Sequence, residues 1–536
     1  MLILGCNETK EPSQQNPFRF TEVETSIEPT VCGELYPTQI LEVNGTGLAL
    51  FDFDIDGDLD LFIVNAASLE DFSSGPSCKL YANVSQDGKI QFEDVTETAL
   101  IDIHAFGTGV AVGDVNGDGF DDLYITCYGP NQLLMNMGDG TFREGASDAG
   151  VADARWGTSA SFGDLDGDGD LDLYVCNYLD YDPSKPPPKA RYKSHEVLGG
   201  PHGLLPQADV VYENMGDGTF SDATLAWGFD VSPSFSLNVA ILDFNDDGLQ
   251  DVFVGNDSMA NNLLINGGKG KKFKNEGLKR GISSNGDGSM QATMGIGIAD
   301  VNGNSRPDLL TTNFSSDTNT LHINDESGFF DDRTKTFGLG LLSRSLLGWT
   351  CGFYDFDGDG DEDVFIVNGH VYPNATLESM DSEYSQPILL MERHGNRFRQ
   401  QPVLQSEKYR DRAAVFGDLD LDGDIDVIVG ERHGNVRVLQ NDSSKQFPLK
   451  IHLQGNNLNP QGLGAAVHLQ LDNGKILSRW KHDGAGFQSS MSTPILIHLP
   501  EGTTPISIEV VWATGVEQVF TEVPQSGEIT LKQESQ

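Results

Sequence analysis

Aspartates spaced two residues apart, directly before an apolar strand, are the feature of this sequence best suited to chemistry. In the segment 163–174, GDLDGDGDLDLY, Asp164, Asp166 and Asp168 stand at positions 1, 3 and 5 of a loop, and Asp172 stands at position 9. Hard oxygen ligands at alternate positions let one short segment supply several of the six to eight oxygens that Ca²⁺ needs. The alternative for a single copy is an acidic surface turn.

Repetition favours the calcium interpretation. The same nine-residue pattern occurs seven times, and an apolar strand rich in Val, Ile, Leu, Phe or Tyr follows each copy. The predicted ligands, at positions 1, 3, 5 and 9 of successive loops, are Asp52, Asp54, Asp56 and Asp60; Asp114, Asn116, Asp118 and Asp122; Asp164, Asp166, Asp168 and Asp172; Asp243, Asn245, Asp247 and Asp251; Asp300, Asn302, Asn304 and Asp308; Asp355, Asp357, Asp359 and Asp363; and Asp418, Asp420, Asp422 and Asp426.

The seven loops differ in carboxylate content, so up to seven Ca²⁺ sites of unequal strength are expected. The fifth loop, 300–308, has asparagine at positions 3 and 5, Ser305 where other loops have glycine, and Pro307 near its end. We expect this loop to bind most weakly or not at all. The role predicted for calcium is structural, because the ion neutralises crowded carboxylates that otherwise repel one another.

The spacing of the loops predicts an all-β fold, a seven-bladed β-propeller followed by a small antiparallel β-sandwich. Loop starts at 52, 114, 164, 243, 300, 355 and 418 leave room for one four-stranded blade per repeat. The segment Phe18 to Val23 resembles the outer strands of other repeats and is expected to complete the last blade. After Asn441 the aspartate pattern stops, and alternating apolar segments indicate the sandwich. The predicted parts are 1–17, an export segment and tether; 18–445, the propeller; and 446–536, the sandwich.

These patterns resemble a known family. The loops with their strands resemble FG-GAP/VCBS repeats, the units of integrin α-chain propellers and of many bacterial surface proteins. The motifs around Asn459, Gly484 to Gln488 (GAGFQ) and Val511 to Gly515 (VWATG) resemble the ASPIC/UnbV domain. Together the two parts are similar to the cartilage acidic protein family and its bacterial relatives, which implies the fold just described.

Charge and composition limit the partners. Eighty-one acidic and 34 basic residues give a net charge of −47, which argues against nucleic acid or an anionic membrane surface and for bound cations. No apolar run is long enough to predict a transmembrane span. Ile3-Leu4-Gly5-Cys6 resembles a bacterial lipobox, so we expect export to the cell surface, periplasm or extracellular space, with a lipid anchor at Cys6; the other interpretation is a chance match.

The remaining cysteines do not form a metal-binding or redox motif. Cys127 and Cys176 stand in apolar strands and are expected to be buried free thiols. Cys32 and Cys78 flank the first repeat, where a disulfide between them stays open as an alternative.

Two regions are candidate binding sites. Three long connections, 66–79, 177–208 and 368–386, are expected on the face opposite the loops, where binding usually concentrates. The second contains a basic island that either binds an anionic partner or is simply solvated. Its members are Lys185, Lys189, Arg191, Lys193 and His195.

The other region is the mouth of the central channel, where residues near the starts of inner strands could form a pocket for a sugar or carboxylate. They are His104, Arg155, Trp156, Trp349, Arg410 and Arg412. The competing interpretation is that the tryptophans pack between blades and the arginines pair with acids. His370, in NGHVYP, is weak evidence for chemistry on its own.

The sequence therefore predicts an exported, calcium-binding surface module for adhesion or binding, with a protein or glycan as partner and no catalytic residue. The alternative is a carbohydrate-active enzyme, similar to a lyase, that uses the channel mouth. No nucleophile elbow, Walker loop or HExxH helix occurs, although absence of a motif does not exclude catalysis.

Overall fold

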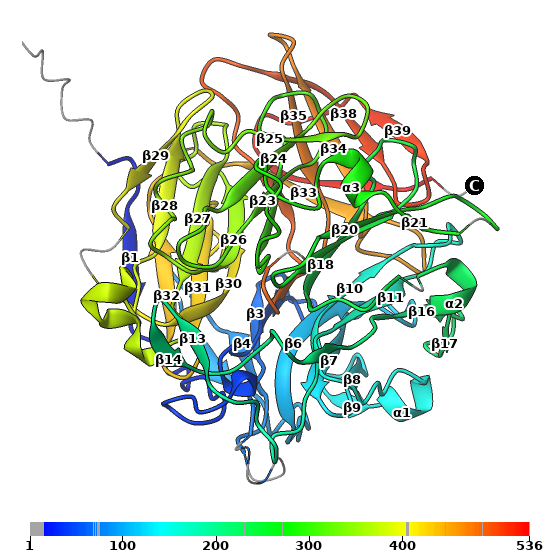
Figure 1. Cartoon of the computed structure of the whole chain (residues 1–536). Coiled ribbons are helices and arrows are strands. Elements are labelled where there is room, and N and C mark those ends of the chain that lie inside the picture. The colour runs from blue at the N-terminus through cyan, green and yellow to red at the C-terminus, as the bar shows by residue number, and fades with distance from the viewer. Residues whose placement is uncertain are drawn as a thin grey trace, which may run out of the picture.

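The protein is almost entirely β-structure (Figure 1). The computed structural model describes residues 16–534 except 68, 70, 72–74, 230, 271, 404–406, 445 and 485, so Cys6 and the predicted lipobox lie outside the described residues. The helices are single turns: α1 (Ala146–Ala149), α2 (Thr224–Trp227), α3 (Gly277–Arg280) and the 3-10 turns η1 (Ile40–Glu42), η2 (Pro373–Thr376) and η3 (Glu378–Met380). In the described part of the chain no helix is long and apolar enough to cross a membrane.

Each of the seven repeats forms one antiparallel sheet of four strands, and the first sheet gains a fifth strand from the carboxyl-terminal domain. The first three are β2 (Leu48–Phe51), β3 (Asp60–Ile63), β4 (Lys79–Asn83) and β5 (Phe92–Asp94); β6 (Phe106–Gly113), β7 (Asp122–Tyr128), β8 (Gln132–Asn136) and β9 (Phe142–Glu144); and β10 (Gly157–Gly163), β11 (Asp172–Asn177), β16 (Val210–Asn214) and β17 (Phe220–Asp222). The fourth and fifth are β18 (Ser236–Leu242), β19 (Asp251–Asn256), β20 (Asn262–Ile265) and β21 (Lys274–Asn275); and β22 (Ile296–Ala299), β23 (Asp308–Thr311), β24 (Thr320–Asn324) and β25 (Phe330–Asp332). The sixth and seventh are β26 (Gly348–Tyr354), β27 (Asp363–Asn368), β28 (Leu389–Arg393) and β29 (Phe398–Gln401); and β30 (Asp411–Gly417), β31 (Asp426–Glu431), β32 (Val436–Asn441) and β1 (Phe20–Val23).

The sheets follow one another in a propeller-like order. Each second strand begins at the position 9 aspartate of its loop, as the repeats predict. The first strands contact their neighbours in sequence, from β2 through β6, β10, β18, β22 and β26 to β30, and β30 contacts β2. Strand β1 is the outer strand of the seventh sheet, with Phe20 opposite Asn441, so the predicted pairing of the amino-terminal strand with the last repeat is confirmed.

The position 9 aspartate fixes both its own loop and the third strand of its sheet. In the third sheet, Asp172 accepts one hydrogen bond from Leu165 N (2.8 Å) and another from Asn214 N (3.0 Å). Asn214 Nδ2 then donates to Val115 O (2.9 Å) in the loop of the preceding sheet. Each sheet is thereby tied to the sheet before it by a buried side chain.

The same link occurs at all seven junctions. The donor and acceptor residues are Asn83 to Leu419, Asn136 to Phe53, Asn214 to Val115, Asn266 to Leu165, Asn324 to Phe244, Arg393 to Val301 and Asn441 to Phe356. The first of these links joins the first sheet to the seventh. Only the sixth sheet replaces the asparagine, with an arginine.

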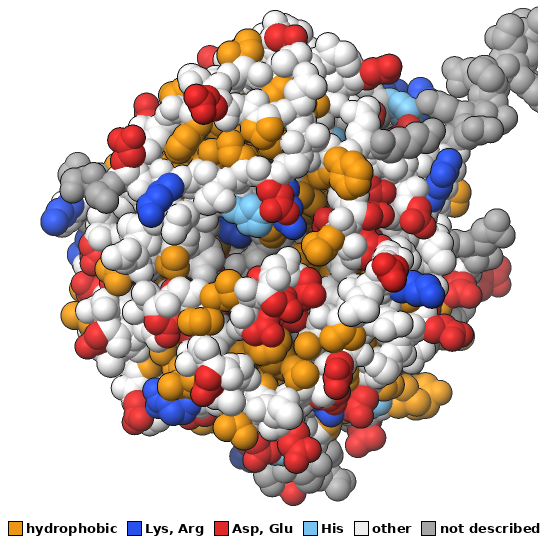
Figure 2. Space-filling view, turned by 180° about the vertical axis from the view of Figure 1, so that it is seen from behind, with side chains coloured by type: hydrophobic (Ala, Val, Ile, Leu, Met, Phe, Trp, Pro, Cys, Tyr) orange, Lys and Arg blue, Asp and Glu red, His pale blue; other side chains and the backbone are white. Residues whose placement is uncertain are grey.

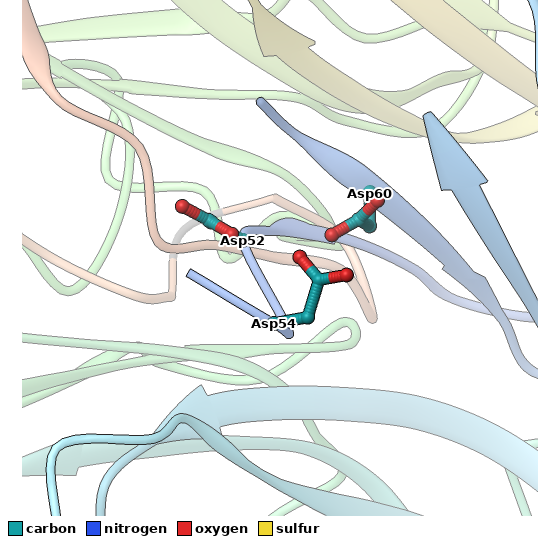
Figure 3. A group of neighbouring side chains, drawn as sticks. All are labelled: Asp52, Asp54 and Asp60. Carbon is teal, nitrogen blue, oxygen red and sulfur yellow. The ribbon is translucent and has the colours of Figure 1, made fainter. Parts of the chain in front are cut away.

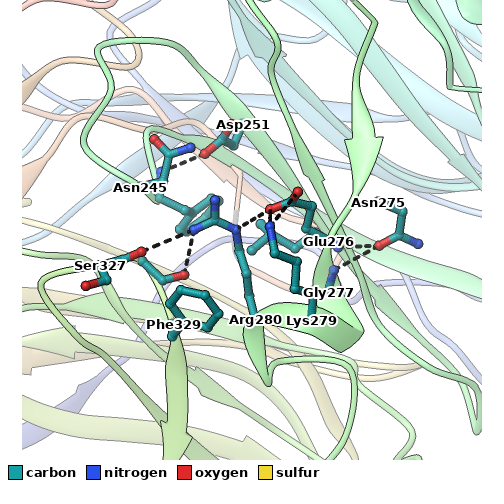
Figure 4. Close-up of polar contacts among 12 residues, drawn as sticks. Asn245, Asp251, Asn275, Glu276, Gly277, Lys279, Arg280, Ser327 and Phe329 are labelled. Atoms are coloured by element: carbon teal, nitrogen blue, oxygen red, sulfur yellow. Dashed lines mark hydrogen bonds and ion pairs between the residues drawn. The ribbon is translucent and has the colours of Figure 1, made fainter.

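Contacts at the outer rim add to these links. Arg280, at the end of α3, donates to Glu276 (2.9 Å) and to Gly328 O (2.9 Å) of the next repeat, and its guanidinium lies 5.6 Å from the centre of the Phe329 ring (Figure 4). The fourth and fifth repeats are thus joined at the rim as well as near the loops.

The carboxyl-terminal part has two sheets around one core. One contains β37 (Ile495–Ile497), β33 (Leu449–Gln454) and β40 (Gly527–Lys532), and the other contains β35 (Ile476–Trp480), β34 (Ala466–Leu471), β38 (Pro505–Val511) and β39 (Glu517–Phe520). Trp512 belongs to their shared core, as predicted, whereas Trp480 is half-buried and packs against the fourth and fifth repeats. The prediction of purely antiparallel pairing is wrong, because the last strand, β40, runs parallel to β33.

This carboxyl-terminal domain, residues 446–534 of the described chain, covers the loop face of the ring. Loop glycines approach it closely: a Cβ added at Gly169 would lie 2.7 Å from Asn456, and one added at Gly360 would lie 2.6 Å from Pro500. The residue at position 8 makes a buried polar contact in two loops: Gln250 Nε2 donates to Gly464 O (3.2 Å), and Glu362 forms an ion pair with Arg479 (3.0 Å).

Residues 482–491, here called the central segment, extend from this domain into the middle of the ring; residue 485 is not described. Strand β36 (Ser490–Met491) pairs with β2 in parallel, which makes the first sheet five-stranded. The Gln488 carbonyl accepts a hydrogen bond from Val110 N (3.2 Å) of β6, and the Phe487 ring packs against Trp349 of β26 with centroids 4.7 Å apart. The described residues of this segment therefore bind inner strands on several sides of the axis.

The five described cysteines are buried and free. The predicted free thiols of Cys127 and Cys176 are confirmed. The disulfide considered between Cys32 and Cys78 is absent from the structure.

Replacing Asn136 by alanine tests the link between sheets. Asn136 is 1% exposed, and its loss leaves the buried Phe53 carbonyl without its 2.8 Å donor, so we expect the free energy of unfolding to fall by about 1–3 kcal/mol. Chemical denaturation measures the change, with Asn435→Ala as control, because Asn435 is exposed. Equal stability of the two variants would contradict the importance of the link.

Candidate metal-binding loops

Four loops bring three carboxylates together, with one oxygen of each residue within 4.8 Å of the others. The groups are Asp52, Asp54 and Asp60 (Figure 3); Asp164, Asp166 and Asp172; Asp355, Asp357 and Asp359; and Asp418, Asp420 and Asp426. These are the first, third, sixth and seventh loops, which carry a carboxylate at all four predicted positions. Among the described residues the second, fourth and fifth loops, with asparagine at position 3, form no such group.

The position 1 aspartate shapes each turn through backbone N–H groups. In the sixth loop Asp355 accepts hydrogen bonds from Gly358 N and Gly360 N, both at 2.8 Å. In the fifth loop Asp300 accepts the equivalent bond from Ser305 N (2.8 Å), and Ser305 takes the left-handed φ of 63° that glycine usually adopts. The turn therefore forms even where the glycine is missing.

An asparagine in a loop keeps one amide oxygen but lacks the charge of a carboxylate. In the fifth loop Asn304 Nδ2 donates to Asn324 O (2.9 Å). In the second loop Asn116 Nδ2 donates to Asp118 (3.0 Å), which occupies one oxygen of that carboxylate. The weakness expected for the fifth loop remains a prediction.

The residues of the four acidic groups fit a hard divalent cation. Buried oxygens of Asp164, Asp357, Asp418 and Asp420 have no hydrogen-bond donor. Burial raises the pKa of Asp164 and Asp357 to about 7 each. Buried carboxylate oxygens without donors are costly, and Ca²⁺ bound to several oxygens removes that cost.

The long connection of the third repeat crosses the opposite face. It contains β12 (Leu179–Asp180), β13 (Ala190–Tyr192), β14 (His195–Val197) and β15 (Leu205–Pro206), and in Figure 1 β13 and β14 lie across the ring from β11. Tyr192 donates to Ser315 O (3.1 Å) of the fifth repeat, and Lys193 donates to Met380 O (2.5 Å) of the sixth. The connection is thus fixed to distant repeats.

Two members of the basic island form ion pairs within this connection. Lys185 pairs with Asp182 (2.9 Å) and Lys189 with Glu196 (3.0 Å). Lys193 is held by the Met380 carbonyl, so three of the island's side chains have partners within the protein.

Packing and ion pairing occupy the residues proposed for the channel mouth. Trp156 is buried against Tyr128, Tyr178 and Tyr181, and Arg155 pairs with Asp153 (2.8 Å). For these two residues the structure shows the competing interpretation, in which tryptophans pack and arginines pair with acids, and not a sugar or carboxylate pocket.

The other members are also engaged locally. Arg410 pairs with Glu431 (2.9 Å), and the exposed His104 contacts Asp102 (3.0 Å). Arg412 stacks on Trp349 at 4.1 Å and donates to backbone carbonyls, including Asp411 O at 2.8 Å. Burial lowers the pKa of Arg412 to about 9.

His370 has a structural environment. Its Nδ1 accepts a hydrogen bond from Tyr372 N (3.0 Å), so Nε2 carries the proton and donates to Ser315 Oγ (3.0 Å). Burial lowers the pKa of His370 to about 3. A histidine that stays neutral with both nitrogens occupied is poorly suited to acid–base catalysis.

Sequence reasoning missed the residues that join the repeats to one another and to the carboxyl-terminal domain. The linking asparagines had a visible signal, since Asn136 and Asn214 both end a strand before the phrase MGDGTF. Asp483 had none: it accepts hydrogen bonds from Ser161 Oγ (2.6 Å) and Phe162 N (2.9 Å), which lie more than 300 positions earlier.

Asp483 predicts a pH dependence. This side chain is 1% exposed, and burial raises its pKa to about 7, above the value of about 3.9 for an unfolded chain. A raised folded-state pKa contributes stability at low pH that is lost as pH rises through the folded pKa. In saturating Ca²⁺, thermal melts from pH 5 to 8 are expected to show a shallower loss of stability for Asp483→Asn than for the parent. An Asp148→Asn control, at an exposed position, should keep the parental slope, and an unchanged slope in Asp483→Asn would contradict the assignment.

Three distant solved structures are similar in part to this chain. A lectin from Agrocybe aegerita that recognises terminal N-acetylglucosamine matches at 15% identity over 84% of this chain and 97% of its own, with a TM-score of 0.39. PorZ, a surface component of the type-IX secretion system of Porphyromonas gingivalis, matches at 10% identity over 93% and 60%, with a TM-score of 0.40. The V. cholerae biofilm matrix protein Bap1 matches at 12% identity over 93% and 69%, with a TM-score of 0.33.

Family models match both parts of the chain, whereas a search of curated proteins finds no match. The FG-GAP-like repeat model matches residues 114–175, 243–311 and 300–366. The ASPIC and UnbV model matches residues 455–536. The repeat matches contain the second to sixth loops and leave out the connection 177–208. The ASPIC and UnbV match contains the carboxyl-terminal strands from β34 onward. The chain therefore belongs to the FG-GAP-like repeat proteins that carry a C-terminal ASPIC and UnbV domain.

Proposed function

We propose that this chain is an exported calcium-binding protein in which a seven-bladed β-propeller, residues 18–445, presents a surface for binding or adhesion. Residues 446–536 form the β-sandwich docked on its loop face, and residues 1–17 are the export segment and tether. The observation that carries the calcium assignment is the set of four three-carboxylate groups, three of which contain a buried oxygen with no hydrogen-bond donor in the described chain. The closed order of inner strands and the links at all seven junctions support the propeller.

Calcium has a structural role in this proposal. The loops lie between their own sheet and the carboxyl-terminal domain, as the contacts of Gly169 with Asn456 and of Gly360 with Pro500 indicate. An ion there neutralises carboxylates that stand at a buried junction, whereas catalysis requires an open coordination position for a substrate. The ions would stabilise the loops and the docked domain together.

The partner-binding surface is assigned to the face opposite the loops. Large apolar side chains are exposed on its connections: Tyr36 is 68% exposed, Leu205 70% and Leu377 44%. Exposed apolar groups on a rigid scaffold favour recognition of a protein or glycan. Export to the cell surface, periplasm or extracellular space agrees with this use.

The competing hypothesis, a lyase-like enzyme that uses the channel mouth, has less support. The central segment binds the inner strands from the loop side, His370 is neutral, and Arg155 and Arg410 are paired with acids. A lyase needs a base and a cation that are free to meet the substrate.

Matched substitutions in the third and fifth loops test the calcium assignment. Asp166 and Asn302 occupy position 3 of their loops and accept the same hydrogen bond from the residue at position 5. We expect Asp166→Ala to remove one Ca²⁺ site by calorimetry and to lower the melting temperature in Ca²⁺, with site affinity in the range of about 10⁻⁴–10⁻³ M. Asn302→Ala should leave the stoichiometry unchanged. A melting temperature that chelation does not alter would overturn the structural role.

The binding face is tested by a protein and glycan screen with the full chain. Leu205→Asp and Tyr36→Ala are expected to abolish or weaken capture of the partner that the screen identifies, because both side chains are exposed there. Leu278→Ala is the control, since Leu278 is 86% exposed on α3 at the outer rim. Loss of binding in the control alone would assign recognition to the rim instead.

A further inference from the structure

A groove of about 440 Å³ lies in the carboxyl-terminal domain, beside the sixth and seventh loops. It is formed by the entry to β33, the 499–504 loop and the turn before β40. Phe447, Leu499 and Pro500 give it an apolar part, while Gln446, Gln525 and Ser526 give it a polar part. Its volume falls in the range of about 300–1,000 Å³ that is usual for small-molecule sites.

The groove differs in charge from the rest of the molecule. None of the described residues that line it is charged, although the chain has a net charge of −47. Figure 2 shows acidic side chains spread over the face seen from behind, with few basic ones. The groove does not favour an anionic ligand, because no cation lines its described part, while Glu501 and the acidic seventh loop lie close by.

Phe447 presents an aromatic ring to solvent. Its side chain is 70% exposed, the highest exposed fraction given for an aromatic side chain of the described chain, with Tyr36 next at 68%. The neighbouring backbone is fixed, because Gly527 N donates to Pro448 O (3.0 Å) and Leu449 begins β33. One side of the ring approaches the seventh loop, where a Cβ added at Gly423 would lie 3.6 Å from it. The ring is thus an exposed aromatic surface on a fixed backbone.

Polar groups beside this ring are available for a ligand. The side chains of Gln446, Gln525 and Ser526 are exposed, and none of them makes a hydrogen bond within the described part of the chain. The opposite wall is ordered by its own bonds, since Thr503 Oγ1 donates to Pro500 O (2.7 Å) and Thr504 N donates to Asp472 (3.2 Å). Two amides and a hydroxyl therefore face the groove with their hydrogen-bonding capacity free.

We propose that this groove binds a neutral saccharide. The apolar C–H face of a pyranose ring stacks on an exposed aromatic ring, and its hydroxyls pair with amide and hydroxyl groups that can both donate and accept. An uncharged sugar needs no counter-charge, whereas a uronate or a sulfated sugar needs a cation that the described lining of the groove does not provide. The site is separate from the face assigned to the partner, so it goes beyond the function proposed above and stands or falls without it.

The experiment measures binding of neutral and charged oligosaccharides to the full chain by saturation-transfer NMR and calorimetry. The probes are glucan, mannan, galactan and chitin oligomers, with oligogalacturonate and a sulfated oligosaccharide as the charged set. We expect at least one neutral oligomer to bind with transfer to its ring C–H protons. Binding of the charged set alone, or of no oligomer, would overturn the proposal.

Variants of Phe447 distinguish this groove from any other sugar-binding site. Phe447→Ala should weaken the neutral ligand about 10-fold, since stacking and apolar burial are lost, while Phe447→Tyr should retain binding because the ring remains. Val519→Ala is the matched control, an apolar side chain 62% exposed on β39 of the same domain. Circular dichroism and melting temperature confirm folding of each variant. Equal affinity of Phe447→Ala and the parent would place the sugar elsewhere and refute the assignment.

Discussion

A buried carboxylate at position 9 of each loop is the constraint on which the ring depends. Asp172 and its six counterparts each accept one N–H hydrogen bond from their own loop and one from the end of the third strand of their sheet. The residue bonded there, an asparagine in six sheets and Arg393 in the sixth, reaches the loop of the preceding sheet. The acceptor is a buried carbonyl, which is costly to leave without a donor. Each loop is therefore completed by the next sheet, and the seventh loop by Asn83 of the first. Closure of the ring satisfies groups that an open array would leave unpaired.

The axis of this ring is filled by chain from the other domain. The central segment needs small residues where it passes the inner strands, since a Cβ added at Gly484 would lie 2.8 Å from Val239 O. Phe487 then fills the space beside Trp349, and Asp483 caps Phe162 N. Because these contacts join positions far apart in sequence, the described residues of the carboxyl-terminal domain and the repeats pack together on this side.

Much of this architecture could be predicted from the sequence, and the limits have physical causes. Loop spacing and apolar strands identified the repeats, and the likeness of Phe18 to Val23 to outer strands identified β1, because both signals are local and repeated. The central segment could not be placed, since GAGFQ has no periodicity that points to the axis. Sequence could not decide between a ligand pocket and local packing for Arg155 and Trp156, because their partners, such as Asp153 and Tyr178, are ordinary residues whose proximity only folding reveals.

Docking and ion binding use the same loops but different positions. Position 8 is polar in the second, fourth and sixth loops, as Asp121, Gln250 and Glu362, and in the fourth and sixth it bonds directly to the carboxyl-terminal domain. Asp121 is buried beside Lys481 of that domain. The predicted cation ligands at positions 1, 3 and 5 lie three to seven residues from position 8 of the same loop. Under the calcium proposal, the charge of a loop and its bond to the docked domain are therefore close enough to interact electrostatically.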